Sequence, residues 1–374
     1  MQLTKQVINW VKKETVLTIA IILAILSMFF VTPDQQYLKY IDVKTLVILF
    51  CFMAVIAGMT QIGVFAWLAG GMLERVKNIR QLLFLLVMLC FFFSMLITND
   101  VALITFVPLT LVILQTQDKK IKEKWLVPTV VLQTVAANMG SMLTPIGNPQ
   151  NLYLYGQSNM SCLKFMGIML PYTVLAFLLL IVLIFIISRK SKDVLRVASS
   201  DKGKPIEKKK LVLYLALCIP LFLTVLRCLD YRILFVIVLL LVGGFDRKTF
   251  VRIDYSLLFT FVAFFIFIGN MGRMTAFSSL LSRVIEGREV MTGVFASQIM
   301  SNVPAALLLS GFTSDYKALM IGTNLGGLGT LIASMASLIS YKLVVRENPF
   351  IKGKYMVTFT VVNVLFLGVM MLIP

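Results

Sequence analysis

Long runs of apolar residues, separated by short polar segments, follow one another along the whole chain. About 20 helical residues cross the hydrocarbon core of a bilayer, and most of these runs approach that length. The pattern therefore predicts an all-α polytopic membrane protein. We expect spanning helices at about 15–31, 45–57, 125–155, 165–188, 211–226, 231–245, 255–270, 316–341 and 355–373.

Two further apolar segments, 82–116 and 290–313, are predicted to be hairpins that enter and leave the membrane on the same side. The first has basic flanks at both ends and a polar tip, Thr98-Asn99-Asp100. Each of its arms has about 16 residues, or about 24 Å of helix, which is short for a crossing. A re-entrant hairpin fits this length, and two tight spanning helices are the alternative. Irregular backbone at such depth must be buried in protein or line a cavity, so the tip is a candidate site.

Among the charged side chains, Asp100 alone lies deep inside an apolar segment. A carboxylate at that depth costs about 2.5–3.5 kcal/mol on insertion scales, so it is rare without a functional reason. Composition supports the membrane assignment, because 59% of residues are hydrophobic and only 14% are charged.

The net charge of +18 could indicate a nucleic-acid partner, but the positions of the basic residues argue against one. Of 35 lysines and arginines, 26 fall in alternate loops, as the positive-inside rule expects of cytoplasmic segments. The chain is thus predicted to lie in the cell membrane with a cytoplasmic N-terminus. The cytoplasmic stretches are 1–14, 74–81, 117–124, 189–210, 246–254 and 342–354. The first apolar run lacks a signal cleavage site and is interpreted as an anchor.

The same composition leaves little chemistry for an enzyme. Histidine is absent, the five cysteines have no metal or redox spacing, and one intramembrane acid provides no acid–base pair. We therefore expect no enzyme, no metal centre and no cofactor. A channel is another class, but no ring of charges or filter repeat is visible.

The second half of the chain carries segments similar to those of the first. SMLITNDVALITFVPL (94–109) resembles SQIMSNVPAALLLSGF (297–312), which aligns Asn99 with Asn302. AANMGSMLTPIGNPQN (136–151) resembles GTNLGGLGTLIASMAS (322–337). The second similarity aligns Asn138 with Asn324, Gly140 with Gly326, and Thr144 with Thr330.

An additional span at 211–226 would place the second copy upside down. The predicted organisation is a first repeat at 1–188, a basic cytoplasmic linker at 189–210, the connecting helix, and a second repeat at 227–374. Inverted repeats with Gly/Pro-interrupted helices in matching places indicate a transporter site near the midplane. Small residues shared for helix packing are the alternative, but they explain TPIGNPQN poorly, because its prolines and asparagines should break a helix.

Each break should expose backbone amides, which attract anions, and carbonyls, which attract cations. The predicted substrate-binding residues are Thr98, Asn99, Asn148, Ser301, Asn302, Thr323 and Asn324. The predicted cation-coupling residues are Asp100, Asn99, Thr144, Gly147 and Asn302, and Na⁺ could bind at Asn99, Asp100 and Gly147. Each asparagine could instead be only a helix cap.

At these residues the chain resembles the ion transporter superfamily, most specifically in ITNDVALITFVPL and LTPIGNPQNL. That group includes divalent-anion/sodium symporters, citrate transporters, arsenite permeases and a class of sodium/proton antiporters. The resemblance implies a dimerising scaffold and a transport domain that moves as an elevator. It also implies two opposed hairpins and two unwound helices in that domain.

The predicted hairpin tips differ from the tips of the symporters in this superfamily. Symporter tips read Ser-Asn-Thr, whereas the final threonine is replaced by Asp100 in the first tip and by Val303 in the second. The Asn-Asp tip and TPIGNPQN look closer to the arsenite-permease branch.

These observations predict a secondary active transporter of a small anion or oxyacid, either a carboxylate or an inorganic one. Its coupling ion would be Na⁺ or H⁺, with Asp100 as the coupling residue. Arsenite/antimonite efflux and sodium/proton antiport are the alternative transport functions. In a further alternative, Asp100 only caps the returning arm of its hairpin.

Overall fold

The computed structural model describes residues 14–191, 193 and 206–373, and every regular element in these ranges is a helix. This agrees with the predicted all-α architecture. Five of the described helices are long and apolar enough to cross a membrane: Val43–Gln61, Ile79–Ile97, Cys162–Ser188, Tyr255–Arg273 and Pro349–Met370. The predicted cytoplasmic segment up to residue 13, and most of the linker, lie outside the described residues.

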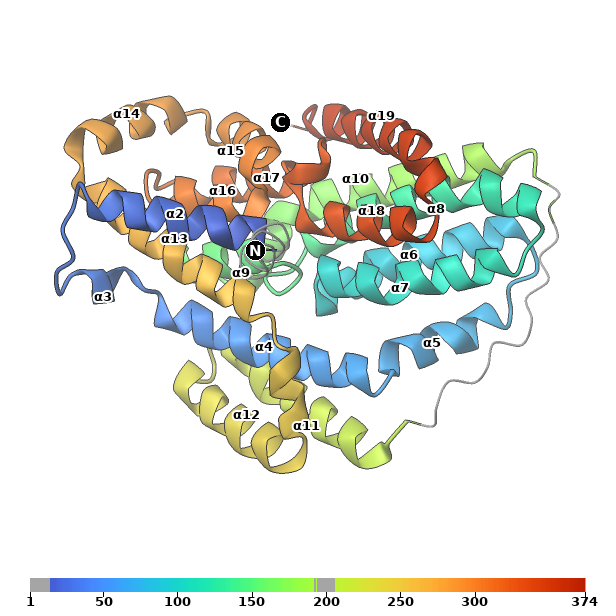
Figure 1. Ribbon diagram of the computed structural model, residues 1–374, viewed down its shortest axis with the longest axis horizontal. Coiled ribbons are helices and arrows are strands. Elements are labelled where there is room, and N and C mark those ends of the chain that lie inside the picture. Colours follow the sequence, from blue (N-terminus) through green and yellow to red (C-terminus); the bar gives the residue numbers. More distant parts are fainter. Residues whose placement is uncertain (1–13, 192, 194–205, 374) are drawn as a thin grey trace, which may run out of the picture.

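One set of helices, here called the peripheral helices, forms the left and lower parts of the molecule in Figure 1. Within it, α13 packs along α2, and α4 packs against α11, α12 and the 3-10 helix η1. The set comprises α2 (Thr15–Met28), α3 (Tyr37–Tyr40), α4 (Val43–Gln61), α11 (Lys208–Val225), α12 (Tyr231–Phe245), η1 (Arg247–Arg252) and α13 (Tyr255–Arg273).

A second set, the central helices, contains the segments that were predicted to form the two hairpins and the two interrupted helices. From the first half they are α6 (Ile79–Ile97), α7 (Asn99–Gln115), α8 (Lys119–Ser141), α9 (Pro149–Gln157) and α10 (Cys162–Ser188). From the second half they are α15 (Glu289–Met300), α16 (Asn302–Ser310), α17 (Tyr316–Leu325), η2 (Leu331–Ala333), α18 (Met335–Glu347), η3 (Pro349–Ile351) and α19 (Lys352–Met370). Figure 1 shows α6 and α7 in the right half of the molecule and α15 and α16 in the left half.

Two shorter helices join the peripheral helices to the central ones. They are α5 (Val64–Leu73), which leads to α6, and α14 (Thr275–Ile285), which leads to α15. Gly63 separates α4 from α5 with a φ of 76°, a left-handed conformation that glycine adopts without a steric penalty. The chain can therefore change direction sharply at this point.

The arms of the first helix pair are longer than the sequence predicted. Helix α6 has 19 residues and α7 has 17, against about 16 for each expected arm. The prediction assigned Ile79, Arg80 and Gln81 to a loop because their neighbours are polar. In the structure these three residues form the first turn of α6, which the Asn78 side chain caps. Of these two arms, α6 is long and apolar enough to cross a membrane by itself.

Both interrupted helices break where glycine or proline residues gather, and these residues disfavour a helix. In the first, α8 ends at Ser141 and α9 begins at Pro149, whose missing N–H is harmless at a first helical position. Asn148 caps α9 by accepting a hydrogen bond from the backbone N of Asn151 at 2.9 Å. In the second, α17 ends before Gly326 and α18 resumes at Met335.

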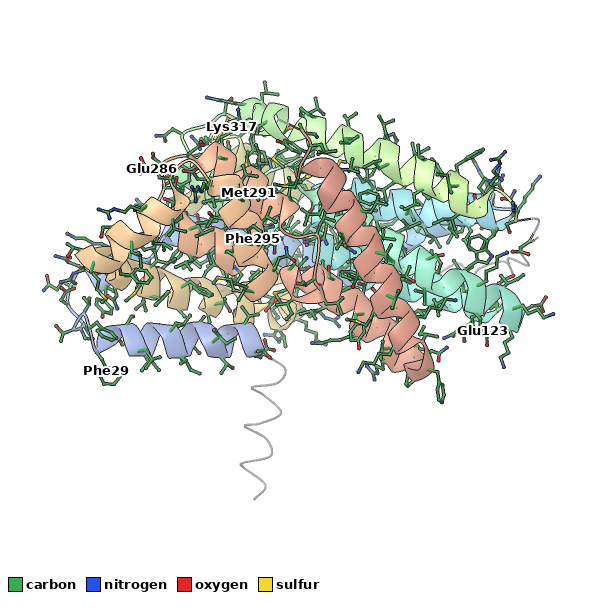
Figure 2. The ribbon with its side chains drawn as sticks, turned by 90° about the horizontal axis from the view of Figure 1, so that it is seen from above. Phe29, Glu123, Glu286, Met291, Phe295 and Lys317 are labelled. Carbon is green, nitrogen blue, oxygen red and sulfur yellow. The ribbon has the colours of Figure 1, made fainter. Side chains whose placement is uncertain are left out.

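Ion pairs in the structure join loops that the charge pattern places on the same side of the membrane. Lys124 pairs with Asp193 and Lys210 with Asp246, both between predicted cytoplasmic segments. Figure 2 shows Glu123, from a predicted cytoplasmic segment, at one end of the molecule, and Phe29 and Glu286 at the other. The same view shows α19 lying obliquely across its neighbours, where it packs against α8 and α10.

The start of the linker is fastened to the central helices through Asp193. Its carboxylate accepts hydrogen bonds from Trp125 Nε1 at 2.9 Å and Ser191 Oγ at 2.8 Å, and its backbone oxygen accepts one from Ile79 N. The indole N–H of Trp125, followed by the Ser191 hydroxyl, lowers the pKa of this carboxyl below its usual value. We expect this contact to stabilise the N-terminal ends of α6 and α8.

Asp193→Asn should loosen the contact at Trp125. The free energy of unfolding should fall by less than about 1 kcal/mol, because the ion pair between Lys124 and Asp193 is partly exposed. Since the folded-state pKa is lowered, the contribution is complete above the ordinary value of about 3.9 and is lost as pH falls through the lowered value. The measurement is Trp125 fluorescence in a protein whose Trp10 and Trp67 are replaced by phenylalanine. Glu123→Gln is the control and should leave the emission unchanged; an unchanged emission in Asp193→Asn would contradict the prediction.

Candidate functional site

Each helix pair turns on a single residue in a rarely used backbone conformation. Thr98 lies between α6 and α7 with φ 74° and ψ 152°, and Ser301 lies between α15 and α16 with φ 75° and ψ 153°. Residues other than glycine seldom adopt positive φ, and such conformations cost about 1–3 kcal/mol and cluster at functional sites. The two turning points therefore have nearly the same backbone geometry, although they lie in different halves of the chain.

Both tips are held against an unwound segment by buried polar contacts. The backbone N of Asn99 donates to the carbonyl oxygen of Gly147 at 3.1 Å. At the other tip, Ser301 Oγ donates to the carbonyl oxygen of Ala333 at 3.5 Å. Asn302, the counterpart of Asn99, is also buried. Each tip thus contacts the break in the helix that follows it.

Asn138, near the end of α8, connects the first tip to the second break. Its Oδ1 accepts hydrogen bonds from Asn99 Nδ2 at 3.1 Å and from Ser334 Oγ at 3.0 Å. Its Nδ2 donates to the carbonyl oxygen of Gly327 at 3.3 Å and to Ser337 Oγ at 3.4 Å. A residue of the first half therefore satisfies polar groups of the second.

Asn324, near the end of α17, makes the reciprocal connection. Its Oδ1 accepts from Asn148 Nδ2 at 3.1 Å, and its Nδ2 donates to Asn151 Oδ1 at 2.6 Å. Asn148 and Asn151 precede Ser334 and Ser337 by 186 positions, the same interval that separates Asn138 from Asn324. Hydrogen bonds therefore join the two broken helices, and equivalent residues of each helix contact the other.

Asp100 is the first-turn acid of α7, and its Oδ1 is buried without a hydrogen-bond partner among the described residues. Its backbone N donates to Asn99 Oδ1 at 3.0 Å. A buried acceptor without a donor is costly, and a buried charge more so, unless a proton, a cation or a ligand compensates it. The unpartnered oxygen marks a place where such a group could bind.

A cavity of about 460 Å³ adjoins Asp100. Its wall combines the first tip and the first break with the peripheral helix α4, the start of α13 and part of α18. Most of the lining is apolar. The polar lining residues are Thr60, Gln61, Thr98, Asp100, Asn148, Arg252 and Asp254.

Gln61, the last residue of α4, is the second group in this cavity with an unsatisfied atom. Its Oε1 is buried and lacks a hydrogen-bond partner among the described residues. Pockets that combine an apolar wall with a few convergent polar groups are typical of small-molecule sites. The cavity is therefore lined from both sets of helices, and two of its acceptors are free to bind donors or a cation.

Comparison with known proteins identifies the family. The family model described as "Citrate transporter" matches residues 6–315. The chain belongs to the citrate transporter family. It is therefore a multi-pass membrane transporter and not an enzyme, as the sequence predicted.

The chain is also similar to three individual proteins. It is 32% identical over 330 residues to an uncharacterized transporter of Methanocaldococcus jannaschii, with 87% of each chain covered. It is 29% identical over 325 residues to the inner membrane protein YbiR of Escherichia coli, covering 85% of this chain and 84% of that one. The silicon efflux transporter LSI3 of Oryza sativa subsp. japonica is 29% identical over 154 residues, 41% of this chain and 30% of that protein.

The predicted site residues of the transporter fall into two sets. Thr98, Asp100 and Asn148 line the cavity. The others do not appear on its wall; Asn99, Gly147 and Asn324 lie in the network behind it. Thr144 donates to the carbonyl oxygen of Met95, and Thr323 to that of Leu319 within its own helix. Ser301 and Asn302 lie at the second tip.

Several polar residues of the site were not among those predicted. Asn138 was aligned with Asn324 from sequence but assigned no role, although that alignment was the available signal. Asn151, Ser334 and Ser337 could have been found by applying the same interval of 186 positions. Gln61 has no such signal, because a glutamine at the end of an apolar helix resembles an ordinary interfacial residue.

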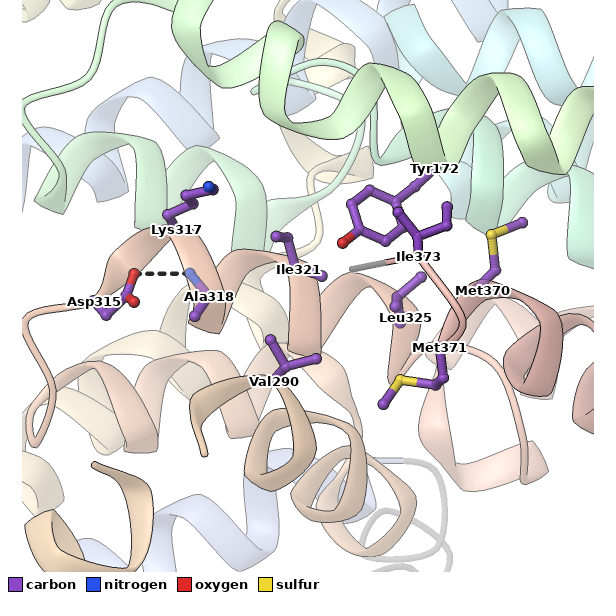
Figure 3. Close-up of a pocket in the computed structure, with 10 residues that line it drawn as sticks. All are labelled: Tyr172, Val290, Asp315, Lys317, Ala318, Ile321, Leu325, Met370, Met371 and Ile373. Carbon is purple, nitrogen blue, oxygen red and sulfur yellow. Dashed lines mark hydrogen bonds between the residues drawn. The ribbon is translucent and has the colours of Figure 1, made fainter. Parts of the chain in front are cut away.

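A second cavity, of about 230 Å³, lies between α10, α15, α17 and the end of α19. Figure 3 shows Tyr172 and Met371 on its wall and Asp315 capping α17 through Ala318 N at 2.9 Å. It contains none of the predicted site residues and no atom from either tip. The cavity beside Asp100 is therefore the better candidate for the transported molecule.

Proposed function

We propose that the protein is a secondary active transporter of a small anion or oxyacid, driven by H⁺ or Na⁺. The substrate binds in the cavity between α4 and the first tip, and the coupling ion neutralises Asp100. The observation that supports this proposal most directly is the buried, unpartnered Oδ1 of Asp100 on the cavity wall.

The charge of Asp100 restricts the form of the substrate. Burial disfavours an ionised carboxylate, whereas a nearby cation favours it, so proton and cation can replace one another at such a group. An anion beside a permanently ionised Asp100 would be repelled. The substrate therefore enters as a neutral oxyacid, or as an anion together with the proton or cation that neutralises Asp100.

Gln61 adds a second reason to favour a hydroxyl-bearing oxyacid. The free Oε1 of Gln61 and the free Oδ1 of Asp100 are both acceptors, and hydroxyl groups of an undissociated acid would donate to them. The family description names citrate, and the relative LSI3 is named a silicon efflux transporter. Arsenite/antimonite efflux fits the same reasoning, and sodium/proton antiport would use Asp100 without an organic substrate.

We propose in addition that the two halves form an inverted repeat and that the central helices move as an elevator. The equal geometry of Thr98 and Ser301 supports the repeat, as do the reciprocal contacts of Asn138 and Asn324. The packing is reciprocal too, since α18 packs on α7 while α9 packs on α16. A cavity lined from both α4 and the first tip is where a moving and a fixed part would meet.

The orientation and assembly belong to the same proposal. Arg252 and Asp254, which line the cavity, belong to a predicted cytoplasmic loop. The site would therefore open to the cytoplasmic side of the cell membrane. Exposed apolar side chains on α11 and α12, among them Ile219, Phe222 and Val236, would contact lipid or the partner subunit of a homodimer.

Uptake by proteoliposomes tests the proposal. Labelled citrate, arsenite and silicic acid would be supplied under a Na⁺ gradient or a H⁺ gradient alone. Saturable accumulation under one gradient supports the proposal. Ion exchange without accumulation of any oxyacid would favour antiport, and ohmic conductance would indicate a channel.

A further inference from the structure

The two breaks of the site share their backbone contacts but differ in one side chain. Thr144 Oγ1 donates to the carbonyl oxygen of Met95, and its counterpart Thr330 donates to that of Gln298. Met95 and Gln298 therefore occupy equivalent positions, one turn before each tip. Methionine offers no hydrogen-bond donor, whereas glutamine offers two on one nitrogen.

The Gln298 amide fills the loop of the second break. Its Nε2 lies within hydrogen-bond distance of three carbonyl oxygens, which share its two hydrogens: those of Gly326 at 3.0 Å, Leu328 at 2.9 Å and Val294 at 3.2 Å. Its Oε1 accepts from the backbone N of Thr330 at 2.8 Å. Both ends of the amide are thus bonded to the segment that leaves α17.

Gly329 shows how closely the loop surrounds this amide. A Cβ at residue 329 would lie 2.4 Å from Gln298 Oε1, and its φ of 104° suits glycine alone. The loop therefore leaves no room for a side chain on that side. The contacts of the Gln298 amide with this loop are therefore part of the structure of the break.

Backbone carbonyls that converge on one point in an unwound helix are the ligands that hard monovalent cations take. An amide –NH₂ that points at two such oxygens places partially positive hydrogens where a bound cation would lie. Because it is tethered to α15, its local concentration is high and a free ion must displace it. The second break also lacks a countercharge, since Val303 stands where the first has Asp100.

We propose that the Gln298 amide permanently fills the cation position of the second break, so that the transporter couples through the Asp100 half of its site alone. This rests on the proposed function only in assigning coupling to Asp100. The occupancy of the second break by an amide can be tested separately, because it concerns cation binding and not transport.

The test is the unfolding temperature of purified protein in NaCl and in choline chloride at equal ionic strength. Gln298→Met introduces the residue type of its counterpart Met95 and removes the amide donor from the carbonyl oxygens of Gly326 and Leu328. We expect sodium to raise its unfolding midpoint by roughly 2–4 °C more than that of the wild type, as for one weakly bound ion. The gain should persist in Asp100→Asn/Gln298→Met, because the two positions are independent.

Two further variants keep the result decisive. Gln298→Glu retains the shape but turns an oxygen toward the carbonyls, so its stability should depend on sodium even if Gln298→Met fails to fold. Gln115→Met makes the same exchange at the exposed end of α7 and should respond like the wild type. If both Gln298 variants respond to sodium as the wild type does, the proposal is overturned.

Asp100→Asn alone gives an independent outcome. Any sodium stabilisation of the wild type should disappear in it, and a stabilisation that survives with Gln298 in place would also overturn the proposal. If proteoliposomes carry no oxyacid yet Gln298→Met gains sodium binding, the proposed function fails while the role of Gln298 stands.

Discussion

Asp100→Asn should lower transport about ten- to hundredfold and remove its dependence on the driving cation gradient. Asparagine keeps the size of the side chain but carries no charge and exchanges no proton. Hydrogen bonds to a charged group contribute about 1.5–3 kcal/mol, which corresponds to that range of affinity. The measurement is initial uptake into proteoliposomes under each gradient in turn.

Asp118→Asn is the matched control, because that carboxylate is exposed before α8 and its side chain forms no cap hydrogen bond. It should transport as the wild type does. The same experiment separates coupling from helix capping, since asparagine at a first helical turn would preserve much of a capping role. Transport by Asp100→Asn with an unaltered cation dependence would rule out coupling at this residue.

Gly140→Ala should destabilise the central helices by about 1–3 kcal/mol or more, the usual effect of overpacking a close interface. A Cβ on Gly140 would lie 2.0 Å from the carbonyl oxygen of Phe91 and 2.6 Å from Ser94 Oγ. The Phe91 oxygen belongs to the backbone of α6 and cannot rotate away, so α6 and α8 must separate. Thermal unfolding in detergent measures the loss.

Gly167→Ala provides the comparison, because Gly167 is also helical but a Cβ there meets nothing within 4 Å. It should be neutral or stabilising by up to about 1 kcal/mol, the helix-propensity difference between the two residues. Gly326→Ala should also be destabilising, because a rotation of the Ser297 hydroxyl would leave Ser297 Cβ at 2.7 Å and the carbonyl oxygen of Gly322 at 2.9 Å from the added Cβ. Equal unfolding temperatures for Gly140→Ala and Gly167→Ala would contradict this account.

The positions of the helices were predictable from sequence because hydrophobic runs and breaking residues are local signals. The predicted helix at 231–245 matches α12 residue for residue, and Pro149 marks the start of α9. Boundaries were less certain where polar residues enter a helix, as in the first turn of α6. A capping asparagine such as Asn78 decides such an end, and it resembles an ordinary loop residue in the sequence.

The candidate site was only partly predictable. Asp100 was recognised because a carboxylate in an apolar run is energetically unusual. The partners of Asn138 were not, since hydrogen bonds across the two halves depend on how the broken helices pack. The contacts of Gln298 have the same origin: a glutamine in SQIMSN gives no indication that its amide reaches carbonyls 28 and 30 residues further along.

The reciprocal asparagine contacts have a consequence for biogenesis. Asn138 is synthesised 189 residues before Gly327 and 199 before Ser337, whose groups satisfy its amide. Until then, a newly inserted first half holds a polar side chain in the membrane without its final partners. Fragments divided at the linker should therefore accumulate when both are expressed together, and each should be degraded when expressed alone.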